Sequence, residues 1–277
     1  MNYRELYLYG IQKLKGGEVP DADYDARLLL EKVCGTDRNT LILHPDREIT
    51  EKEQQDYEAF LTRRAGREPL QHILGDTEFM GLSFLVDERV LCPRQDTEVL
   101  VEEVLRHLMD GSRILDICTG SGCILLSLLH FSNDCEGVGV DLSEDALEVA
   151  KANAERLGID ATFLHSDLCE KVEGQFDMVV SNPPYIASDV IPGLMPEVRD
   201  HEPMMALDGG VSGLDFYERI IPQAREHLRP GGMLFFEIGA DQGEAVKALM
   251  EAQKFAEVEV IKDYAGLDRV VKGYFMR

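Results

Sequence analysis

The sequence has few basic residues, and this shortage limits the partners that the protein can bind. Its 28 lysines and arginines stand against 52 acidic residues, which gives a formal net charge of -24. Non-specific binding to nucleic acid depends on basic side chains that displace counterions from phosphates, so no stable nucleic-acid partner is expected. The charge fits a basic protein partner better. The alternative is that it only confers solubility.

Cysteine pairs and metal-ligand spacings are also missing. None of the six cysteines forms a Cys-x-x-Cys pair, which predicts reduced, mostly buried thiols rather than a disulfide framework. The seven histidines are not spaced as ligands with cysteines or with one another, so no metal site is expected.

Targeting and membrane segments are missing as well. The first residues, Met1 to Glu5, lack the basic and apolar regions of a signal peptide. No apolar stretch approaches the length that spans a bilayer. We therefore expect a cytoplasmic, monomeric protein with no membrane partner.

Residues 1–75 are predicted to form a small helical domain. Pro20 and Asp21 would begin one helix, and Thr50 with Glu53 forms a capping box for another. We interpret this domain as a substrate-recognition domain; the alternative is a stabilising appendage. Residues 78–86 alternate in polarity about Gly81, which predicts that residues 76–92 form a β-hairpin linking this domain to the rest of the chain.

Residues 93–277 are predicted to form an α/β domain. From residue 112 onward strands and helices alternate, which implies right-handed crossovers and a parallel sheet. The expected strands are 113–117, 137–141, 161–165, 176–180, 233–238, 258–264 and 270–275. The expected helices are 93–108, one from about 124, 144–157, 216–228 and 242–252, with a turn at 229–232. The long connection 186–213 is expected to be a lid or a binding loop.

A glycine-containing loop, Cys118-Thr119-Gly120-Ser121-Gly122, follows the first of these strands. It has only two glycines of the dinucleotide fingerprint, because Leu125 stands at the position of the third. Asp141 ends the next strand, where an acid accepts hydrogen bonds from a ribose. The loop therefore predicts a nucleoside without a pyrophosphate, which fits S-adenosyl-L-methionine.

Three more residues are candidates for cofactor contacts. Asp116 could meet the ammonium of the cofactor's amino-acid tail, and Asp167 could accept from the adenine amino group while Leu168 packs on the ring. The alternative for both acids is a role in capping turns at strand ends.

The tetrapeptide Asn182-Pro183-Pro184-Tyr185 follows the strand 176–180 and is the main candidate for a catalytic site. Ligands bind at the carboxyl ends of strands in open α/β sheets. Prolines supply carbonyl oxygens without N–H groups, and Asn182 adds a side-chain acceptor. Such acceptors suit a planar, uncharged NH2 group, whereas the alternative is a rigid loop without a ligand.

The sequence resembles a known family over nearly its whole length. The motifs are Asn182-Pro183-Pro184-Tyr185, Asp116-Ile117-Cys118-Thr119-Gly120-Ser121-Gly122 and Pro93-Arg94-Gln95-Asp96-Thr97-Glu98. They are joined by Arg67-Glu68-Pro69-Leu70-Gln71, Glu202-Pro203 with Ala206-Leu207-Asp208-Gly209-Gly210, and Glu237-Ile238-Gly239 with Gln242-Gly243. Together they resemble the methyltransferases that modify glutamine in peptide chain release factors. One departure is Cys118, where relatives more often have glycine.

The resemblance implies a fold, a cofactor and a substrate. The fold would be the Rossmann-like, seven-stranded sheet of class I S-adenosylmethionine-dependent methyltransferases. The substrate would be the glutamine of the Gly-Gly-Gln motif of class I release factors. Asn182, Pro183 and Tyr185 would act in catalysis, and they and Pro184 would bind the glutamine, with the Tyr185 ring packed on its flat amide. Cys118 to Gly122, Asp141, Asp167, Leu168 and Asn182 would bind the cofactor, with Arg94 and Glu98 supporting the pocket.

Two other functions stay open from the sequence. Asn-Pro-Pro-Tyr also occurs in enzymes that methylate exocyclic amines of nucleic-acid bases, but those would need a basic groove. The second alternative is a protein that binds the cofactor or a release factor without chemistry.

Overall fold

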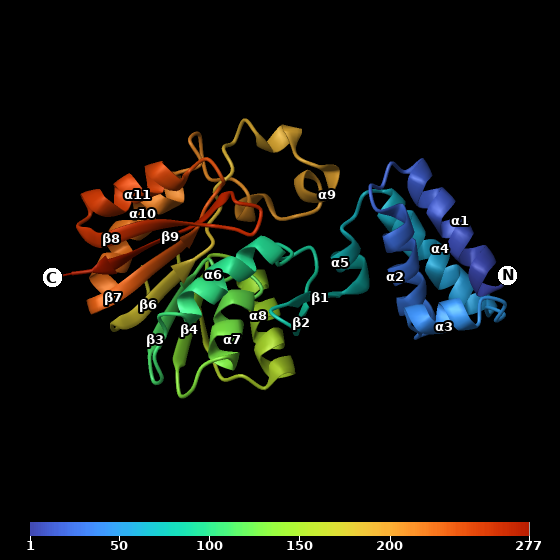
Figure 1. Cartoon of the computed structure of the whole chain (residues 1–277), viewed down its shortest axis with the longest axis horizontal. Coiled ribbons are helices and arrows are strands. Elements are labelled where there is room, and N and C mark those ends of the chain that lie inside the picture. Colours follow the sequence, from blue (N-terminus) through green and yellow to red (C-terminus); the bar gives the residue numbers. More distant parts are fainter. Residues whose placement is uncertain (277) are drawn as a thin grey trace. The chain divides into compact units, whose positions relative to one another are not determined.

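The computed structural model describes residues 1–276, and the chain forms two compact units (Figure 1). The first unit contains Met1–Asp76 and a separate segment, Met195–His201. The second contains Thr77–Leu194 and the chain from Glu202 onward.

The first unit is helical, as predicted. It comprises α1 (Tyr3–Gly16), α2 (Ala22–Cys34), α3 (Arg38–Leu43), α4 (Glu51–Ala65), α5 (Leu70–Leu74) and the short α9 (Pro196–Arg199). The predicted capping box at α4 is present, because Thr50 accepts from the Glu53 amide while the Glu53 carboxylate accepts from Thr50. α2 ends at Gly35 in a left-handed conformation, which closes its last turn.

A buried ion-pair network holds α9 in this unit. Arg64 donates to Asp25 at 2.7 Å and to Glu197 at 2.9 Å, and Arg67 donates to both oxygens of Glu197. Asp25, Arg64 and Glu197 are all buried. Removing one partner of such a network leaves an uncompensated buried charge, so its members depend on one another.

The second unit contains a hairpin and a seven-stranded sheet. The hairpin strands are β1 (Asp76–Phe79) and β2 (Leu82–Leu85), as the alternation around Gly81 predicted. The sheet strands are β3 (Arg113–Ile117), β4 (Glu136–Asp141), β5 (Thr162–His165), β6 (Phe176–Ser181), β7 (Leu228–Glu237), β8 (Phe255–Lys262) and β9 (Asp268–Phe275). Their order across the sheet is β5-β4-β3-β6-β7-β9-β8.

The sheet is mixed rather than wholly parallel. Strands β3 to β7 run parallel, as predicted, but β9 is antiparallel to both β7 and β8. The expectation of a parallel sheet was therefore wrong for β9, whereas β8, which is antiparallel to β9, runs in the same direction as β7. The short connection between β8 and β9 explains this, because a parallel crossover needs a dozen residues or more.

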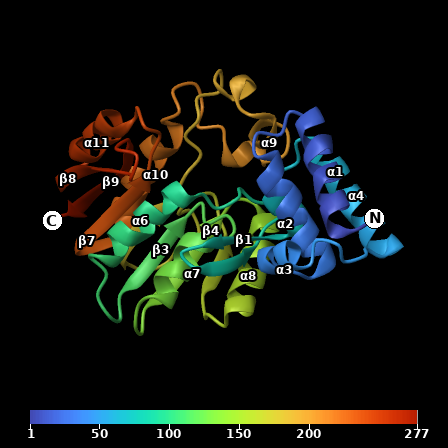
Figure 2. The same ribbon diagram turned by 45° about the vertical axis from the view of Figure 1, so that its right-hand side comes forward.

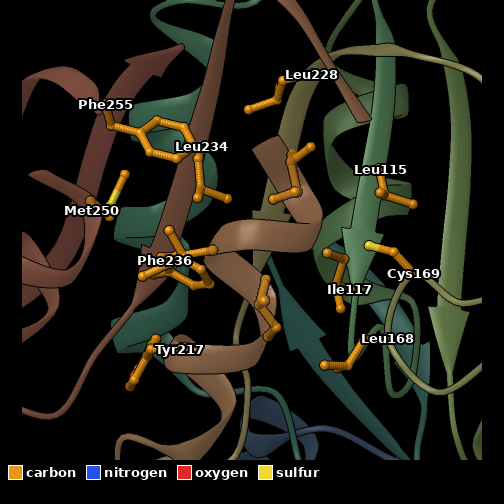
Figure 3. Close-up of a cluster of buried hydrophobic side chains, with 14 of the residues drawn as sticks. Leu115, Ile117, Leu168, Cys169, Tyr217, Leu228, Leu234, Phe236, Met250 and Phe255 are labelled. Carbon is orange, nitrogen blue, oxygen red and sulfur yellow. The ribbon is translucent and has the colours of Figure 1, made fainter. Parts of the chain in front are cut away.

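Helices cover both faces of this sheet (Figures 1 and 2). α6 (Gln95–Leu105), α7 (Cys123–His130) and α8 (Glu144–Leu157) lie on one face, and α10 (Asp215–His227) and α11 (Gly243–Ala252) lie on the other. Successive strand residues alternate between two hydrophobic clusters, with Leu115 and Val179 in one and Ile114 and Met178 in the other. Figure 3 shows the cluster under α10 and α11, where the Tyr217 ring packs edge-on against Phe236 of β7.

Several element boundaries differ from the prediction; β8, for example, is Phe255–Lys262 instead of 258–264. α6 ends at Leu105 instead of continuing to residue 108. The predicted turn at 229–232 lies inside β7 as an irregularity, because Leu228 pairs with Phe176 while Met233 already pairs with Met178. Residues 229–232 of β7 therefore have no paired partner in β6, although the two strands are paired on either side of them.

Candidate active site

The carboxyl ends of three neighbouring strands meet at one cavity. Ile117 of β3 is level with Val140 of β4 and with Ser181 of β6, so the loops after these strands lie together. The cavity has a volume of about 560 Å³. Nine of the predicted site residues line it: Cys118, Thr119, Gly120, Ser121, Asp141, Asp167, Leu168, Asn182 and Pro184.

The loop after β3, Cys118–Gly122, turns sharply through left-handed backbone. The φ angles are +61° at Cys118, +54° at Gly120 and +78° at Gly122. Glycine adopts this region without steric cost, but a residue with a Cβ atom does not. The backbone thus gives a physical reason for glycine at position 118, where this chain carries cysteine.

Asp116 lies beneath this loop rather than in the cavity wall. Its carboxylate accepts from the Thr119 hydroxyl at 2.6 Å, and its other oxygen is buried without a hydrogen-bond partner among the described residues. Burial raises the pKa of Asp116 to about 7. Asp116 is not a lining residue of the cavity in the described chain, so the expected contact between its carboxylate and a cofactor ammonium stays a prediction.

Asp141 lines the cavity and also shapes it. One oxygen accepts from the Gly120 amide and the other from the Ser143 amide, both at 2.9 Å. Burial raises the pKa of Asp141, while these amide hydrogen bonds oppose the rise. A carboxylate held in this way keeps further lone pairs for a ligand's hydroxyl groups.

Asp167 and Leu168 follow β5 and lie on the same wall. Asp167 forms an ion pair with Arg219 at 2.8 Å, and Leu168 has a left-handed backbone with φ of +50°. Leu168 is buried next to Phe216 of α10, another lining residue. An acid beside an apolar surface suits a planar ring with an amino group.

We call Asn182–Tyr185 the acceptor rim. Asn182 lines the cavity, and its amide NH2 donates to the Thr97 hydroxyl at 3.5 Å. Its amide oxygen is thus the atom left to accept a hydrogen bond from a ligand. Pro184 also lines the cavity, whereas Pro183, Tyr185 and Gly122 are not among its lining residues in the part of the chain described.

Tyr185 has a different environment from the one expected. Its ring packs against the hydrophobic cluster under α10, and its hydroxyl donates to Glu237 at 3.3 Å. Burial raises the pKa of Tyr185 above its ordinary value, and the nearby Glu237 charge adds to that rise. Because Tyr185 is not a lining residue of the cavity in the described chain, the stacking of its ring on an acceptor amide stays a prediction.

Several lining residues were not identified from the sequence. Thr97 belongs to the Pro-Arg-x-Asp-Thr-Glu motif, which was the signal for it. Met204 and Met205 come from the long connection after the acceptor rim and carried no signal of their own.

Arg94 and Glu98, both expected to support the pocket, differ in position. Arg94 lines the cavity and donates to both oxygens of buried Glu202 at 2.7 Å. Glu98 instead accepts from the Met80 amide at 2.6 Å in the hairpin.

All six cysteines are free thiols. Among residues 1–276, no cluster of three or more His, Cys, Asp or Glu side chains could hold a metal ion. Within the same residues, no helix is both long enough and apolar enough to cross a membrane.

Two family models match the chain. The PrmC N-terminal domain matches residues 5–75, and the methyltransferase small domain matches residues 94–192. The first match covers helices α1 to α5, and the second covers the loop after β3 and the acceptor rim.

Curated relatives match over most of the chain. A release factor glutamine methyltransferase of Geobacter sulfurreducens is 44% identical over 92% of this chain and 90% of its own. One of Moorella thermoacetica is 41% identical over 99% of both chains. Among solved structures, a methyltransferase from Pyrococcus furiosus is similar in fold, with a TM-score of 0.56 and 19% identity over 72% of this chain and 92% of that one.

Proposed function

The chain belongs to the release factor glutamine methyltransferases, and from this premise we propose which atoms carry its reaction. The protein transfers a methyl group from S-adenosyl-L-methionine to the side-chain nitrogen of glutamine in the Gly-Gly-Gln motif of class I peptide chain release factors. The observation that carries the proposal is the position of Asn182 in the wall of the same cavity as Gly120 and Asp141.

The residues of the cavity fit S-adenosyl-L-methionine. Asp141 would accept from the ribose hydroxyls, Asp167 from the adenine amino group, and Leu168 with Phe216 would cover the adenine ring. Left-handed glycines in the loop after β3 let the backbone approach a ligand closely. When bound, the cofactor supplies an electrophilic methyl group on its sulfonium.

The acceptor rim would orient the glutamine. An amide nitrogen is uncharged at neutral pH but a poor nucleophile, because its lone pair is delocalised into the carbonyl. The Asn182 side-chain oxygen and the Pro183 carbonyl would accept hydrogen bonds from its NH2 group. These bonds fix the nitrogen in line with the methyl group and stabilise the positive charge that develops on it.

The first unit would recognise the release factor. Its helical fold and its match to the PrmC N-terminal domain support this role. A release factor presents a folded surface beyond its Gly-Gly-Gln loop, and a separate unit can bind that surface.

The test is methylation of a purified release factor. The protein, cofactor and release factor are incubated, and tandem mass spectrometry locates any added methyl group. We expect one methyl group on the glutamine of Gly-Gly-Gln and almost none with Asn182→Ala. Methyl transfer to DNA or RNA but not to the release factor would contradict the proposal.

A further inference from the structure

The loop after β7 contacts the acceptor rim at Tyr185, through residues that do not line the cavity. β7 lies next to β6 in the sheet, with Phe236 level with Ser181, so Glu237 and the residues after it follow the same edge as the rim. These residues form the motif Glu237-Ile238-Gly239 with Gln242, which has no part in the reaction described so far. Neither Glu237 nor Gln242 is a lining residue of the cavity within the described chain.

Tyr185 is held at both its side chain and its backbone by this loop. Its hydroxyl donates to the Glu237 carboxylate at 3.3 Å, and its carbonyl accepts from the Gln242 side-chain NH2 at 3.0 Å. The Gln242 amide is itself fixed, because its oxygen accepts from the Gly239 amide at 2.9 Å and its NH2 also donates to the Gly213 carbonyl at 3.1 Å.

Glycines press against the rim at the same place. A Cβ atom at Gly209 would lie 2.7 Å from the Tyr185 Cα atom, and one at Gly213 would lie 2.5 Å from the Tyr185 carbonyl oxygen. Both distances are too short for any side chain. The rim therefore packs directly against the backbone of two segments, and Gln242 joins one of them to it by hydrogen bonds.

Glu237 also lies near Thr97, the residue that contacts Asn182 at the other end of the rim. Glu237 is buried, one of its oxygens accepts from the Tyr185 hydroxyl, and Thr97 lies near enough to lower its pKa. Thr97 in turn accepts from the Asn182 amide. The first and last residues of the rim are thus linked to one carboxylate.

We propose that Glu237 and Gln242 are positioning residues for glutamine methylation. They hold Asn182 and the backbone of residues 183–185 so that the acceptor oxygens meet the glutamine NH2 in the orientation that transfer requires. The physical basis is that a misplacement of about 1 Å in a reacting geometry can lower a rate by about 100-fold. This inference rests on the proposed function.

Three variants and one control test the proposal. Gln242→Leu keeps the size of the side chain but removes its three hydrogen bonds, to the Tyr185 and Gly213 carbonyls and from the Gly239 amide. Tyr185→Phe removes only the hydroxyl. Glu237→Gln keeps an acceptor for that hydroxyl. Gln253→Leu makes the same chemical change as Gln242→Leu at the end of α11, away from the rim. For each protein, kcat is measured with a release factor, the dissociation constant for the cofactor by calorimetry, and folding by thermal unfolding.

We expect Gln242→Leu to lower kcat about 10- to 100-fold and Tyr185→Phe about 10-fold, as positioning losses do. Glu237→Gln keeps an acceptor for the Tyr185 hydroxyl but loses the charge of the carboxylate, so it should lower kcat, though less than Tyr185→Phe does. Gln253→Leu should stay within about 3-fold of the wild type, and all variants should bind the cofactor with nearly unchanged affinity. A residue with a merely structural role would lower thermal stability and cofactor affinity together with kcat.

Two results would overturn the proposal. One is an unchanged kcat in both Gln242→Leu and Tyr185→Phe while the wild type methylates the release factor; this leaves the proposed function intact. The other is a fall in cofactor affinity that accounts for the whole loss of activity. If Gln242→Leu does not fold, Tyr185→Phe alone decides, since it keeps the ring that packs in the core. A wild-type protein that methylates no glutamine would instead reject the proposed function itself.

Discussion

The loop after β3 and the acceptor rim after β6 lie at the same cavity but are held in different ways. The loop is fixed largely by near neighbours in the sequence: Thr119 bonds to Asp116, and the Gly122 amide donates to the Thr119 carbonyl. Its more distant partners include Asp141 and Asn153, which are only 21 and 32 residues from the loop residues that they bond. The rim is fixed by Thr97, Glu237 and Gln242, which lie 52 to 85 residues away from their partners in it. One side of the site is thus set by local backbone conformation, and the other by the order of strands in the sheet.

Because the loop after β3 and the acceptor rim are held differently, we expect substitutions in them to change different measurable properties. Substitutions in the loop should change cofactor affinity and stability, because in the proposed complex its backbone amides and Asp141 would face the cofactor. Substitutions at the rim should change the rate of transfer, because its oxygens would face the acceptor.

The largest expected effect is at Asn182. Asn182→Ala removes a preorganised acceptor and should lower kcat by about 100- to 1,000-fold, with the cofactor dissociation constant changed by less than about 3-fold. Steady-state kinetics with a release factor and calorimetry with the cofactor check this. Asn133→Ala, in an exposed turn of the same unit, is the control. A cofactor affinity that falls as steeply as kcat would erase the distinction between the two sides.

The next effect is at Asp141. Asp141→Ala removes a charged acceptor and the anchor of the Gly120 amide, so cofactor affinity should weaken about 10- to 100-fold, as losses of hydrogen bonds to charged groups do. At saturating cofactor, kcat should change much less. Glu136→Ala, at the exposed start of the same strand, serves as the comparison in calorimetry. Unaltered affinity in Asp141→Ala would remove this residue from the cofactor site.

A matched pair of glycines tests the local character of the loop. An alanine at Gly120 meets no atom within 4 Å among the described residues, so only the left-handed backbone opposes it, at a cost of about 1 kcal/mol. An alanine at Gly122 adds contacts of 3.2 Å with Ala150 and Leu126, which should bring the cost to about 2 kcal/mol or more. Urea unfolding of both variants measures the difference. Equal costs would show that crowding against α8 is unimportant.

The smallest effect concerns pH. Burial raises the pKa of Glu237, and the Thr97 hydrogen bond and the Arg269 charge only partly oppose this rise. The folded state therefore binds this proton more tightly than the unfolded chain, whose glutamate pKa is about 4.3. Protonated Glu237 therefore contributes to the free energy of unfolding at low pH. This contribution is lost as the pH rises from the pKa of the unfolded chain through the raised pKa of the folded state.

The variant Glu237→Gln cannot lose this proton. Its free energy of unfolding, relative to the wild type, should therefore increase as pH rises from about 4.5 to 8. Urea titrations at several pH values provide the comparison, with Glu251→Gln on the exposed side of α11 as the control. The prediction is contradicted if the free energy of unfolding of the wild type, relative to that of Glu237→Gln, increases as the pH rises.

The contrast between the two sides also explains what the sequence could predict. Strands β3 and β6 were placed within a residue because they are short apolar runs, and the helix Glu144–Leu157 was placed correctly because Ser143 caps it and Gly158 ends it. The loop after β3 was identified for the same reason: its glycines and the distance to Asp141 are visible along the chain.

The supports of the acceptor rim could not be predicted in this way. That Gln242 bonds to the Tyr185 carbonyl depends on β7 lying beside β6, which no local pattern encodes. The same holds for Tyr185, whose expected position on the acceptor amide followed from its ring alone. The sequence marked Glu237 and Gln242 as motif residues, but only their contacts connect them to the site.

The place of β9 in the sheet has a consequence for misfolding. β9 lies between β7 and β8, so β8 has its ladder with β9 and not with β7. Loss of β9 would therefore detach two strands at once and open one long edge of β7. Leu234, Phe235 and Phe236 of that strand are fully buried in the folded protein. An unpaired edge of such residues is a template for pairing with other chains, so damage to this single strand should end in aggregation rather than in a shorter, soluble sheet.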